Sequence, residues 1–372
     1  MRELCTGYGK VDIIWFDGLG GKPEDWDARR LILMIRELQP GVLINNRAGL
    51  PADFDTPEQR VGGFQTDRPW ESCITICHQW AYKPNDNMKS LEECLQTLIR
   101  CAGGDGNLLF NVGPMPTGEI EPRQVARLKE MGEWLTRYGQ TIYATRGGPF
   151  KPGSWGASTH KGNTVYVHIF NWPDGSADLQ LPSIGKRVIG DSVLTGGTAS
   201  VKQTDQGTWI SVAPPDRHDI DTIVALELDG PAAEVAPVGM PSGSLATGAR
   251  ARASNVHTGG PSFAPEKAFD DDNGTRWATD RGVTQAWLEV DLGKPQTVGR
   301  ALIREAHRRV RQFELQYKEG DTWKVLASGT RLGEPFEVEF APVTARVFRL
   351  DIQKATDGPT IWEFQVFPPK AE

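Results

Sequence analysis

Two acidic residues are the first candidates for chemistry in this sequence. Asp17 ends a short apolar run, and Glu58 lies in a long loop that also carries Asp53 and Asp55. Between them stands Arg47, which follows a second apolar run. Two facing carboxyl groups hydrolyse a glycosidic bond when one attacks the anomeric carbon and the other protonates the leaving oxygen. These residue types therefore indicate a glycosidase as one hypothesis.

The stretch before Asp17 predicts the element that positions it. Residues 11–16 read V-D-I-I-W-F, and the run ends in a turn that contains Gly18. Such a run is typical of a strand buried in a parallel sheet. In α/β barrels, side chains at the carboxyl ends of the strands perform the chemistry. Asp17 takes this position, although an Asp that only caps the following turn gives the same pattern.

Residues 1–145 alternate short apolar runs with amphipathic helices. Strands are predicted at residues 11–16, 42–44, 73–76, 107–112 and 140–145. Ser90 with Glu93 predicts a capping box at the start of one helix, and Pro122 predicts the first turn of another. Repeated strand-helix units indicate a parallel sheet. Because a closed barrel needs eight units, the predicted fold class is α/β plus all-β, beginning with a partial (β/α) TIM-type barrel.

The remainder of the chain predicts strands and turns. Alternating polar and apolar residues, separated by Gly, Pro and Asp, predict an antiparallel β-sandwich over residues 146–231. Residues 232–244 are rich in Pro, Gly, Ala and Ser and predict a linker. Residues 245–372 are again all β. The expected domains are therefore 1–145, 146–231 and 245–372, joined by the linker 232–244.

Composition excludes several classes of partner. The net charge of −7 gives no reason to expect binding to nucleic acid or to an anionic membrane. No apolar run approaches the roughly 20 residues of a membrane span, and no leader opens the chain. Five cysteines, all in the first third, predict reduced and buried thiols. Reduced thiols are compatible with the cytoplasm, but the localisation stays unassigned because a natural start could lie upstream.

A set of short motifs in the first 145 residues resembles glycoside hydrolase family 29, the α-L-fucosidases. The motifs follow one another in consistent order: I-W-F-D-G at 14–18, I-N-N-R at 44–47, D-F-D-T-P-E-Q at 53–59, W-E-S-C at 70–73, G-N-L-L-F-N-V-G-P at 106–114 and G-E-W-L-T-R-Y-G at 132–139. The resemblance extends over about residues 1–230. It implies a retaining enzyme that releases terminal α-L-fucosyl residues from oligosaccharides or glycoconjugates.

The resemblance also implies roles for single residues. Asp17 matches the catalytic nucleophile, Glu58 matches the acid/base, and Arg47 matches an active-site arginine. Trp15 and Trp80 match aromatic residues that pack on the apolar face of the sugar. Each position has a plainer alternative: an ion pair for Asp17, a solvated loop residue for Glu58, and ordinary core packing for the tryptophans. Double displacement of this kind needs no cofactor.

The sequence departs from the family in one respect. Members carry about three barrel strands ahead of the nucleophile strand, and this chain has none of them. A half-open barrel exposes strand edges and apolar faces. We therefore expect a homo-oligomer or a complementing fragment that completes the barrel. The alternative function is a catalytically inactive fucose- or galactose-binding protein, or a half-barrel subunit that needs a second chain.

The last region resembles a discoidin-like family 32 carbohydrate-binding module, which is a jelly-roll sandwich. The matching motifs are A-F-D-D-D-N-G-T-R-W at 268–277, W-L-E-V-D-L-G at 287–293 and W-E-F-Q-V-F at 362–367. The resemblance implies a structural calcium ion held by an acidic loop and a late Glu, with the alternative of a solvated turn. Its candidate ligands are Asp270, Asp272, Thr275 and Glu363. Arg304, His307 and Trp277 are weaker candidates for contact with sugar.

Overall fold

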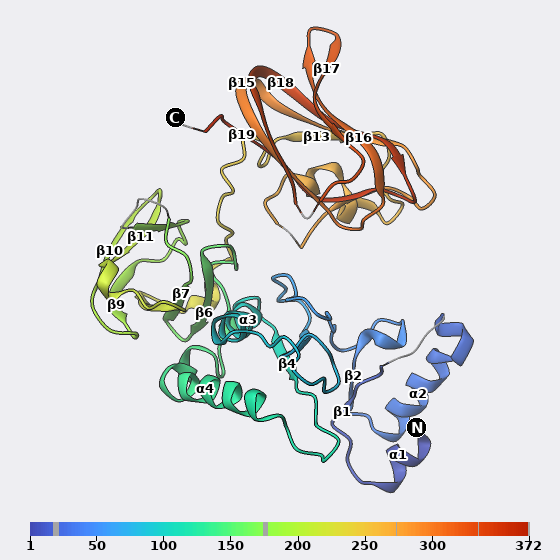
Figure 1. Cartoon of the computed structure of the whole chain (residues 1–372), viewed down its shortest axis with the longest axis vertical. Coiled ribbons are helices and arrows are strands. Elements are labelled where there is room, and N and C mark those ends of the chain that lie inside the picture. Colours follow the sequence, from blue (N-terminus) through green and yellow to red (C-terminus); the bar gives the residue numbers. More distant parts are fainter. Residues whose placement is uncertain (18–21, 174–177, 273, 334, 371–372) are drawn as a thin grey trace. The chain divides into compact units, whose positions relative to one another are not determined.

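A computed structural model describes residues 1–372 except 18–21, 174–177, 273, 334 and 371–372. The chain divides into two compact units, Met1–Val238 and Gly239–Glu372 (Figure 1). Within the described residues, no helix has both the length and the apolar character needed to cross a bilayer. All five cysteines are free and buried, which confirms the prediction of reduced, buried thiols.

The first unit begins with parallel strands. Their bounds are β1 (Ile13–Ile14), β2 (Leu43–Ile44), β3 (Glu71–Thr75) and β4 (Asn107–Asn111). β1 pairs with β2, and β3 pairs with β4, all in parallel. The two pairs are linked by parallel bridges from Asn45 to Phe54 and from Asp55 to Trp70. In the described part of the chain β1 and β4 each pair with one strand only, so this parallel arrangement is open at both edges.

Four helices accompany these strands. They are α1 (Arg2–Gly7), α2 (Ala28–Leu38), α3 (Leu91–Gly103) and α4 (Pro122–Tyr138), with short 3₁₀ turns η1 (Pro23–Trp26), η2 (Asn46–Ala48) and η3 (Gly139–Thr141). The predicted capping box is confirmed, because the Ser90 hydroxyl accepts from the Glu93 amide while the Glu93 carboxylate accepts from the Ser90 amide. Pro122 opens α4 as predicted.

The strand predicted at residues 140–145 is wrong. Instead, η3 occupies the first part of this segment, and the Tyr143 amide donates to the Gly139 carbonyl. Ala144 has a φ of 58°, which an extended strand does not permit. The segment therefore turns back on itself, and the next strand begins only at Arg146.

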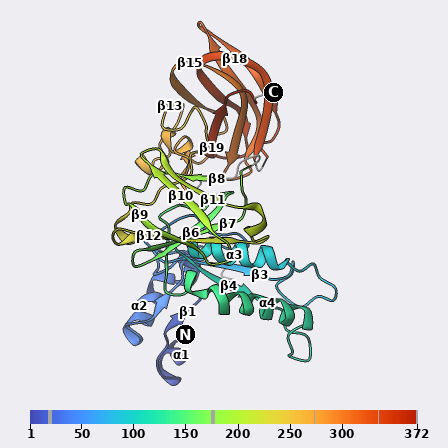
Figure 2. The same ribbon diagram turned by 90° about the vertical axis from the view of Figure 1, so that its left-hand side faces the viewer.

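The second part of the first unit is antiparallel, as predicted. One sheet has the order β5-β6-β7-β12-β9, and a three-stranded sheet has the order β10-β11-β8. The bounds are β5 (Arg146–Gly147), β6 (Gly156–Lys161), β7 (Thr164–Ile169), β8 (Asp178–Leu181), β9 (Val188–Val193), β10 (Ala199–Thr204), β11 (Gly207–Val212) and β12 (Thr222–Leu228), with 3₁₀ turn η4 (Pro214–Asp216) after β11. β6 contacts α3 (Figure 2), and Leu95 and Trp134 share one core with Ala157 and Ile223. Helices and strands on either side of residue 145 are thus joined by a continuous core.

Part of the segment predicted as a linker packs on the first unit. It contains the 3₁₀ turn η5 (Ala232–Glu234), and Ala232 is fully buried. The Val238 amide donates to the Pro149 carbonyl, and the Lys151 amide donates to the Val238 carbonyl. The compact first unit therefore continues through Val238, and the second unit begins at Gly239.

The second unit is a β-structure with the order β14-β19-β15-β18-β16-β17, and β13 pairs with β15. Its elements are β13 (Arg250–Ala253), η6 (Gly260–Phe263), η7 (Pro265–Ala268), β14 (Trp277–Ala278), β15 (Ala286–Glu305), β16 (Val310–Glu319), β17 (Thr322–Gly329), β18 (Phe336–Ala355) and β19 (Thr360–Phe367). β15 is one long strand, and it contains the motif W-L-E-V-D-L-G at residues 287–293. Its pairing register with β18 shifts after Asp291 and after Val298. On its other side, the first part of β15 pairs with β13 and the last part with β19.

Candidate active site

Arg47 connects the two carboxylates that the sequence singles out. It lies in η2, directly after β2. Its Nη1 lies 2.9 Å from Oδ1 of Asp17 and 2.6 Å from Oε2 of Glu58. Since both oxygens contact one nitrogen, they are separated by at most 2.9 and 2.6 Å together, about 5.5 Å. This limit applies to the two oxygens that contact Arg47, and it is compatible with the roughly 5–5.5 Å between the carboxyl groups of retaining glycosidases.

Asn45 fixes the backbone next to Asp17. Its side chain is fully buried, its Oδ1 accepts from the Phe16 amide at 2.9 Å, and its Nδ2 donates to the Phe16 carbonyl at 2.9 Å. The side chain at the end of β2 thereby replaces the backbone ladder beyond the end of β1. Our sequence reasoning gave Asn45 no role, although an Asn directly after an apolar strand was a usable signal.

The loop that carries Glu58 is fixed against β3. The Gln59 amide donates to the Cys73 carbonyl at 2.9 Å, and the Cys73 amide donates to the Pro57 carbonyl at 2.8 Å. Nearby, the Thr56 hydroxyl accepts from Nε of Arg47 at 3.0 Å. These contacts fix the backbone of Glu58. Its side chain forms the ion pair with Arg47, although it is 44% exposed.

Trp15 lies between Arg47 and a third carboxylate. The guanidinium carbon of Arg47 is 4.3 Å from the centre of the indole ring, and the indole N–H donates to Oε1 of Glu71 at 3.2 Å. Glu71 lies in the W-E-S-C motif at residues 70–73 and is not among the predicted site residues. In the structure its hydrogen-bond partner is Trp15, which makes Glu71 part of this cluster.

Trp80 is a predicted site residue that the structure leaves apart from the others. It follows β3 in a loop and is 39% exposed. Among the described residues, no hydrogen bond, ion pair or ring contact joins it to Asp17, Arg47 or Glu58. Its predicted contact with sugar remains a prediction.

One face of the parallel strands lies open. Ile13, Leu43 and Leu109 are 55, 48 and 42% exposed, whereas Ile44, on the other face of β2, is fully buried. Ile13 and Leu43 are direct partners in the β1–β2 pairing. Parallel sheets are normally covered on both faces. The Asp17 side chain is likewise 69% exposed, so the cluster around Arg47 is accessible to solvent.

The thiol of Cys73 lies among these charges. Burial raises the pKa of Cys73, and the carboxylates Glu58, Glu71 and Asp17 act in the same direction, whereas Arg47 opposes them. Cys73 therefore stays a neutral thiol at neutral pH and is not a nucleophile in this cluster.

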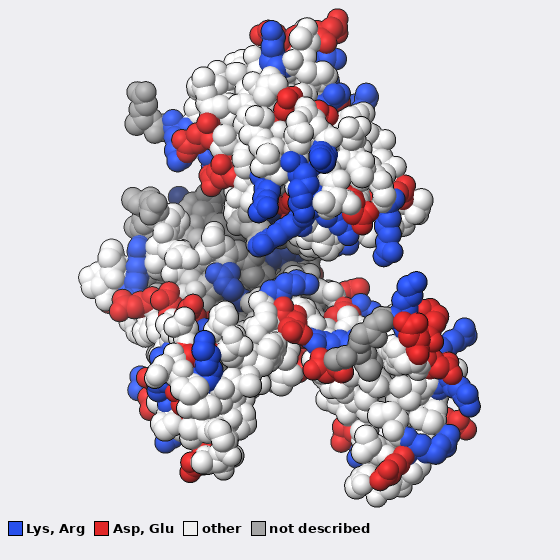
Figure 3. Space-filling view, turned by 45° about the vertical axis from the view of Figure 1, so that its right-hand side comes forward, with Lys and Arg blue, Asp and Glu red and all other residues white. Residues whose placement is uncertain are grey.

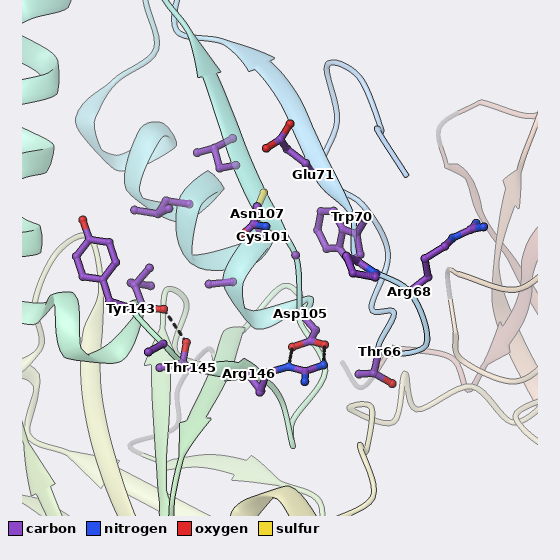
Figure 4. Close-up of a pocket in the computed structure, with 17 residues that line it drawn as sticks. Thr66, Arg68, Trp70, Glu71, Cys101, Asp105, Asn107, Tyr143, Thr145 and Arg146 are labelled. Atoms are coloured by element: carbon purple, nitrogen blue, oxygen red, sulfur yellow. Dashed lines mark hydrogen bonds and ion pairs between the residues drawn. The ribbon is translucent and has the colours of Figure 1, made fainter. Parts of the chain in front are cut away.

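A separate hollow lies elsewhere in the first unit. A pocket of about 720 Å³ is bounded by α3, by the starts of β3 and β4, and by residues 142–146 (Figure 4). Asp105 and Arg146 form a two-pronged ion pair in its wall, with contacts of 2.8 and 2.5 Å. Of the residues around Arg47, this pocket includes only Glu71. The pocket is thus distinct from the pair Asp17 and Glu58, which we prefer as the site because its groups suit hydrolysis.

Two of the predicted calcium ligands in the second unit are in contact. The Thr275 hydroxyl lies 2.9 and 2.8 Å from the two carboxylate oxygens of Asp270, and it also contacts the carbonyl oxygens of Lys267 and Asp272 at 3.3 Å. Within the described residues, no group of three His, Cys, Asp or Glu side chains is placed to hold a metal ion. A cation here must therefore use backbone carbonyl oxygens as well, which calcium accepts.

Glu363 lies buried beside this loop. Neither of its carboxylate oxygens makes a hydrogen bond of normal geometry with a described residue. Burial, followed by the charges of Asp270 and Asp271, raises the pKa of Glu363 to about 8, although the backbone amide of Asp272 acts in the opposite direction. A buried carboxyl among like charges is what a bound cation stabilises, so the donor set fits calcium.

Comparison with known proteins gives two family matches. Residues 1–140 match the family described as alpha-L-fucosidase, and residues 250–364 match the F5/8 type C domain. Human plasma alpha-L-fucosidase is 28% identical over 234 residues, which cover 57% of this chain and 48% of that protein. The chain spans about half the length of the curated relatives it matches.

Solved structures give the same result. Alpha-L-fucosidase isoenzyme 1 from Paenibacillus thiaminolyticus is 32% identical, with a TM-score of 0.54, over 61% of this chain and 60% of that one. An alpha-L-fucosidase from Bacteroides thetaiotaomicron, solved as a trapped covalent intermediate in complex with 2-fluoro-fucosyl fluoride, is 27% identical with a TM-score of 0.55. This match covers 62% of the present chain and 59% of the Bacteroides chain.

Proposed function

From the premise that residues 1–140 are a domain of the alpha-L-fucosidase family, we propose that this chain carries the reacting groups of a retaining α-L-fucosidase. The observation that carries the proposal is the shared contact of Asp17 and Glu58 with Arg47. The covalent intermediate trapped in the Bacteroides relative supports a double displacement. The substrates are terminal α-L-fucosyl groups on oligosaccharides or glycoconjugates.

The two carboxyl groups take different roles. An oxygen of Asp17 attacks C1 of the fucosyl group while the bond from C1 to the leaving oxygen breaks, and Glu58 gives its proton to that oxygen. The glycosyl ester on Asp17 is then attacked at C1 by a water molecule whose proton returns to Glu58. This releases fucose and restores both groups, so no cofactor takes part.

The residues around the pair position the sugar and the charges. Arg47 places Asp17 and Glu58 within reach of one another, and the Trp15 ring packs against the guanidinium. We assign to Trp15 and Trp80 the contact with the apolar face and methyl group of fucose. Glu71 accepts a hydrogen bond from the Trp15 indole and so lies close to the pair. It is therefore the second candidate for the acid/base role, to be compared with Glu58.

We further propose that a complementing chain, or a second copy of this one, covers the open face. The support is the exposure of Ile13, Leu43 and Leu109 and the single pairing of β1 and β4 among the described residues. Measurement of the mass in solution by light scattering tests this proposal. A strict monomer that hydrolyses fucosides at full rate would exclude it.

A structural calcium ion in the second unit is also part of the proposal. Asp270, Asp272, Thr275 and Glu363 are its side-chain candidates. Calcium would neutralise the carboxylates gathered around Glu363 and would take no part in hydrolysis.

Covalent labelling of Asp17 is the direct test of the catalytic proposal. The purified chain is incubated with 2-fluoro-fucosyl fluoride, digested and examined by mass spectrometry, and turnover of an aryl fucoside is measured in parallel. We expect the label on the Asp17 peptide, and loss of turnover and label in Asp17→Asn. Asp12→Asn is the matched control, because the Asp12 side chain is exposed and forms an ion pair with the nearby Lys10.

Three results would contradict the proposal. Unchanged turnover in Asp17→Asn would remove the nucleophile assignment. A label on another carboxylate would do the same. Binding of fucose without turnover by the unaltered chain, alone or with a complementing fragment, would favour the inactive sugar-binding protein instead.

A further inference from the structure

A tryptophan lies on the outward face of the three-stranded sheet β10-β11-β8 in the first unit. Its neighbours along β11, Thr208 and Ile210, are fully buried, whereas Trp209 itself is half-buried. Successive side chains of a strand point to opposite faces of its sheet. Trp209 therefore points away from the core to which Ile210 belongs, and that core does not use its indole.

Polar side chains border Trp209 on this face. It pairs directly with Lys202 of β10 on one side and with Gln180 of β8 on the other. Ser211 is the next residue of β11 on the same face, and Ser200 of β10 is its direct partner. Paired strands lie about 5 Å apart, and residues two positions apart along a strand are separated by about 7 Å. Groups that donate or accept hydrogen bonds thus lie close around the indole.

The indole and its neighbours form a hollow of about 390 Å³. The lining residues are Asp178, Ser200, Lys202, Thr204, Trp209 and Ser211. This volume lies within the roughly 300–1,000 Å³ of small-molecule sites. Within the described part of the chain, the Trp209 side chain makes no hydrogen bond, ion pair or ring contact. Its accessible surface and its N–H group are therefore open to a ligand.

The charges of the hollow indicate a neutral ligand. Lys202 and Asp178 are the only charged residues in the described lining, and their charges are opposite. Figure 3 shows a different kind of surface on the second unit, where Lys and Arg side chains gather on one face. The net charge of the hollow gives an anion no comparable attraction.

We propose that this hollow binds a neutral oligosaccharide. A pyranose ring has an apolar C–H face, which packs on an indole, and a polar edge, which matches the side chains around Trp209. The Lys202 ammonium donates to sugar oxygens, and the Ser200 hydroxyl both donates and accepts. The site lies outside residues 250–364, which match the F5/8 type C domain. It also goes beyond the proposed hydrolysis of fucosides and does not depend on it.

Oxidative footprinting of the full chain tests the site. The chain is exposed briefly to hydroxyl radicals with and without saccharide, and mass spectrometry of the digest gives the oxidation of each tryptophan. The probes are galactotetraose, cellotetraose and a tetramer of galacturonic acid. We expect the two neutral probes to lower the oxidation of Trp209 severalfold and the acidic tetramer to protect it no better. Trp323, a half-buried tryptophan of the second unit, is the internal reference.

A lysine variant sharpens the test without disturbing the core. Lys202→Met keeps the length of the side chain and removes the donor, so half-protection of Trp209 should need about tenfold more saccharide. Lys161→Met is the matched control, because Lys161 is an exposed lysine of β6, in the other sheet of the same unit. Both variants should retain any turnover of an aryl fucoside that the unaltered chain shows.

Several results would overturn the proposal. One is the absence of Trp209 protection by either neutral probe at millimolar concentration. Another is an equal fall in oxidation at Trp323, which would show radical scavenging by the sugar. Protection of Trp209 that rises with protein concentration alone would assign this face to a second copy of the chain. Unchanged half-protection in Lys202→Met would remove Lys202 from the site.

Discussion

The parallel strands of the first unit and the sheet of the second unit bury their apolar residues to very different degrees. Ile13 and Leu109 are about half exposed, whereas Phe313, Phe348 and Phe364 have no exposed surface at all. The second unit covers its own core, but the parallel strands leave one face to solvent. The candidate active site and an uncovered apolar face thus occur in the same part of the molecule, so we expect the chain that completes the sheet also to complete the site.

The largest effect is expected from a substitution of Glu58, in the unit whose parallel strands leave one face exposed. Glu58→Gln should slow hydrolysis of fucosides with poor leaving groups by roughly 10²–10⁴-fold, because no group then protonates the leaving oxygen. Activated aryl fucosides should be affected less, and azide should restore their turnover. Kinetics with both substrate types measure this. Glu71→Gln is the comparison, and a larger loss with azide rescue in that variant would transfer the acid/base role to Glu71.

Removal of an apolar side chain should destabilise the second unit much more than the parallel strands of the first unit. Phe348→Ala should destabilise the second unit by about 3–5 kcal/mol, because it leaves a cavity in a closed core. Leu109→Ala on the open face should change the stability of the isolated chain by only about 0.5 kcal/mol. Urea unfolding followed by fluorescence measures both values. A large effect of Leu109→Ala would show that its face is already covered.

Removal of calcium should act on the second unit alone. Adding millimolar calcium to metal-free protein should raise the Tm of that unit by several degrees, because the ion binds the folded state only. Calorimetry with and without a chelator tests this. Glu363→Gln should remove the calcium effect, and an undiminished shift in that variant would exclude Glu363 as a ligand.

The smallest effect concerns pH. Burial raises the pKa of Glu305. Since the folded state then holds the proton more tightly than the unfolded state, the stabilisation is present below the ordinary Glu pKa and is lost as pH rises through the raised value. Glu305→Gln should flatten this slope in urea titrations at several pH values. A steeper slope in the variant would contradict the sign.

Local rules predicted much of the first unit. The predicted capping box of Ser90 and Glu93 is present at the start of α3, and Pro122 lies in the first turn of α4. Asp17, Arg47 and Glu58 came together because each follows or accompanies a neighbouring parallel strand. Their motifs, together with the family resemblance, predicted that they lie together. Their catalytic roles stay predictions.

Other features depend on packing that a linear pattern does not show. β6 has no apolar alternation that would predict it, because its buried side chains include Ser158 and Thr159. Asn45 was missed because its role is to bind the backbone of a strand about thirty residues away in the chain. Glu71 was not among the predicted site residues, since nothing in its own segment indicates a contact with the indole of Trp15.

The donors of Arg47 have a consequence for selectivity. A guanidinium has five N–H groups, and Asp17, Glu58 and Thr56 occupy most of them, including a long contact of 3.5 Å to the Thr56 carbonyl. Little remains for a sugar hydroxyl. Under the proposed function, Arg47 then holds the two acids in place and does not bind the sugar hydroxyls. The choice among sugars would be made by other groups, including any that a complementing chain supplies.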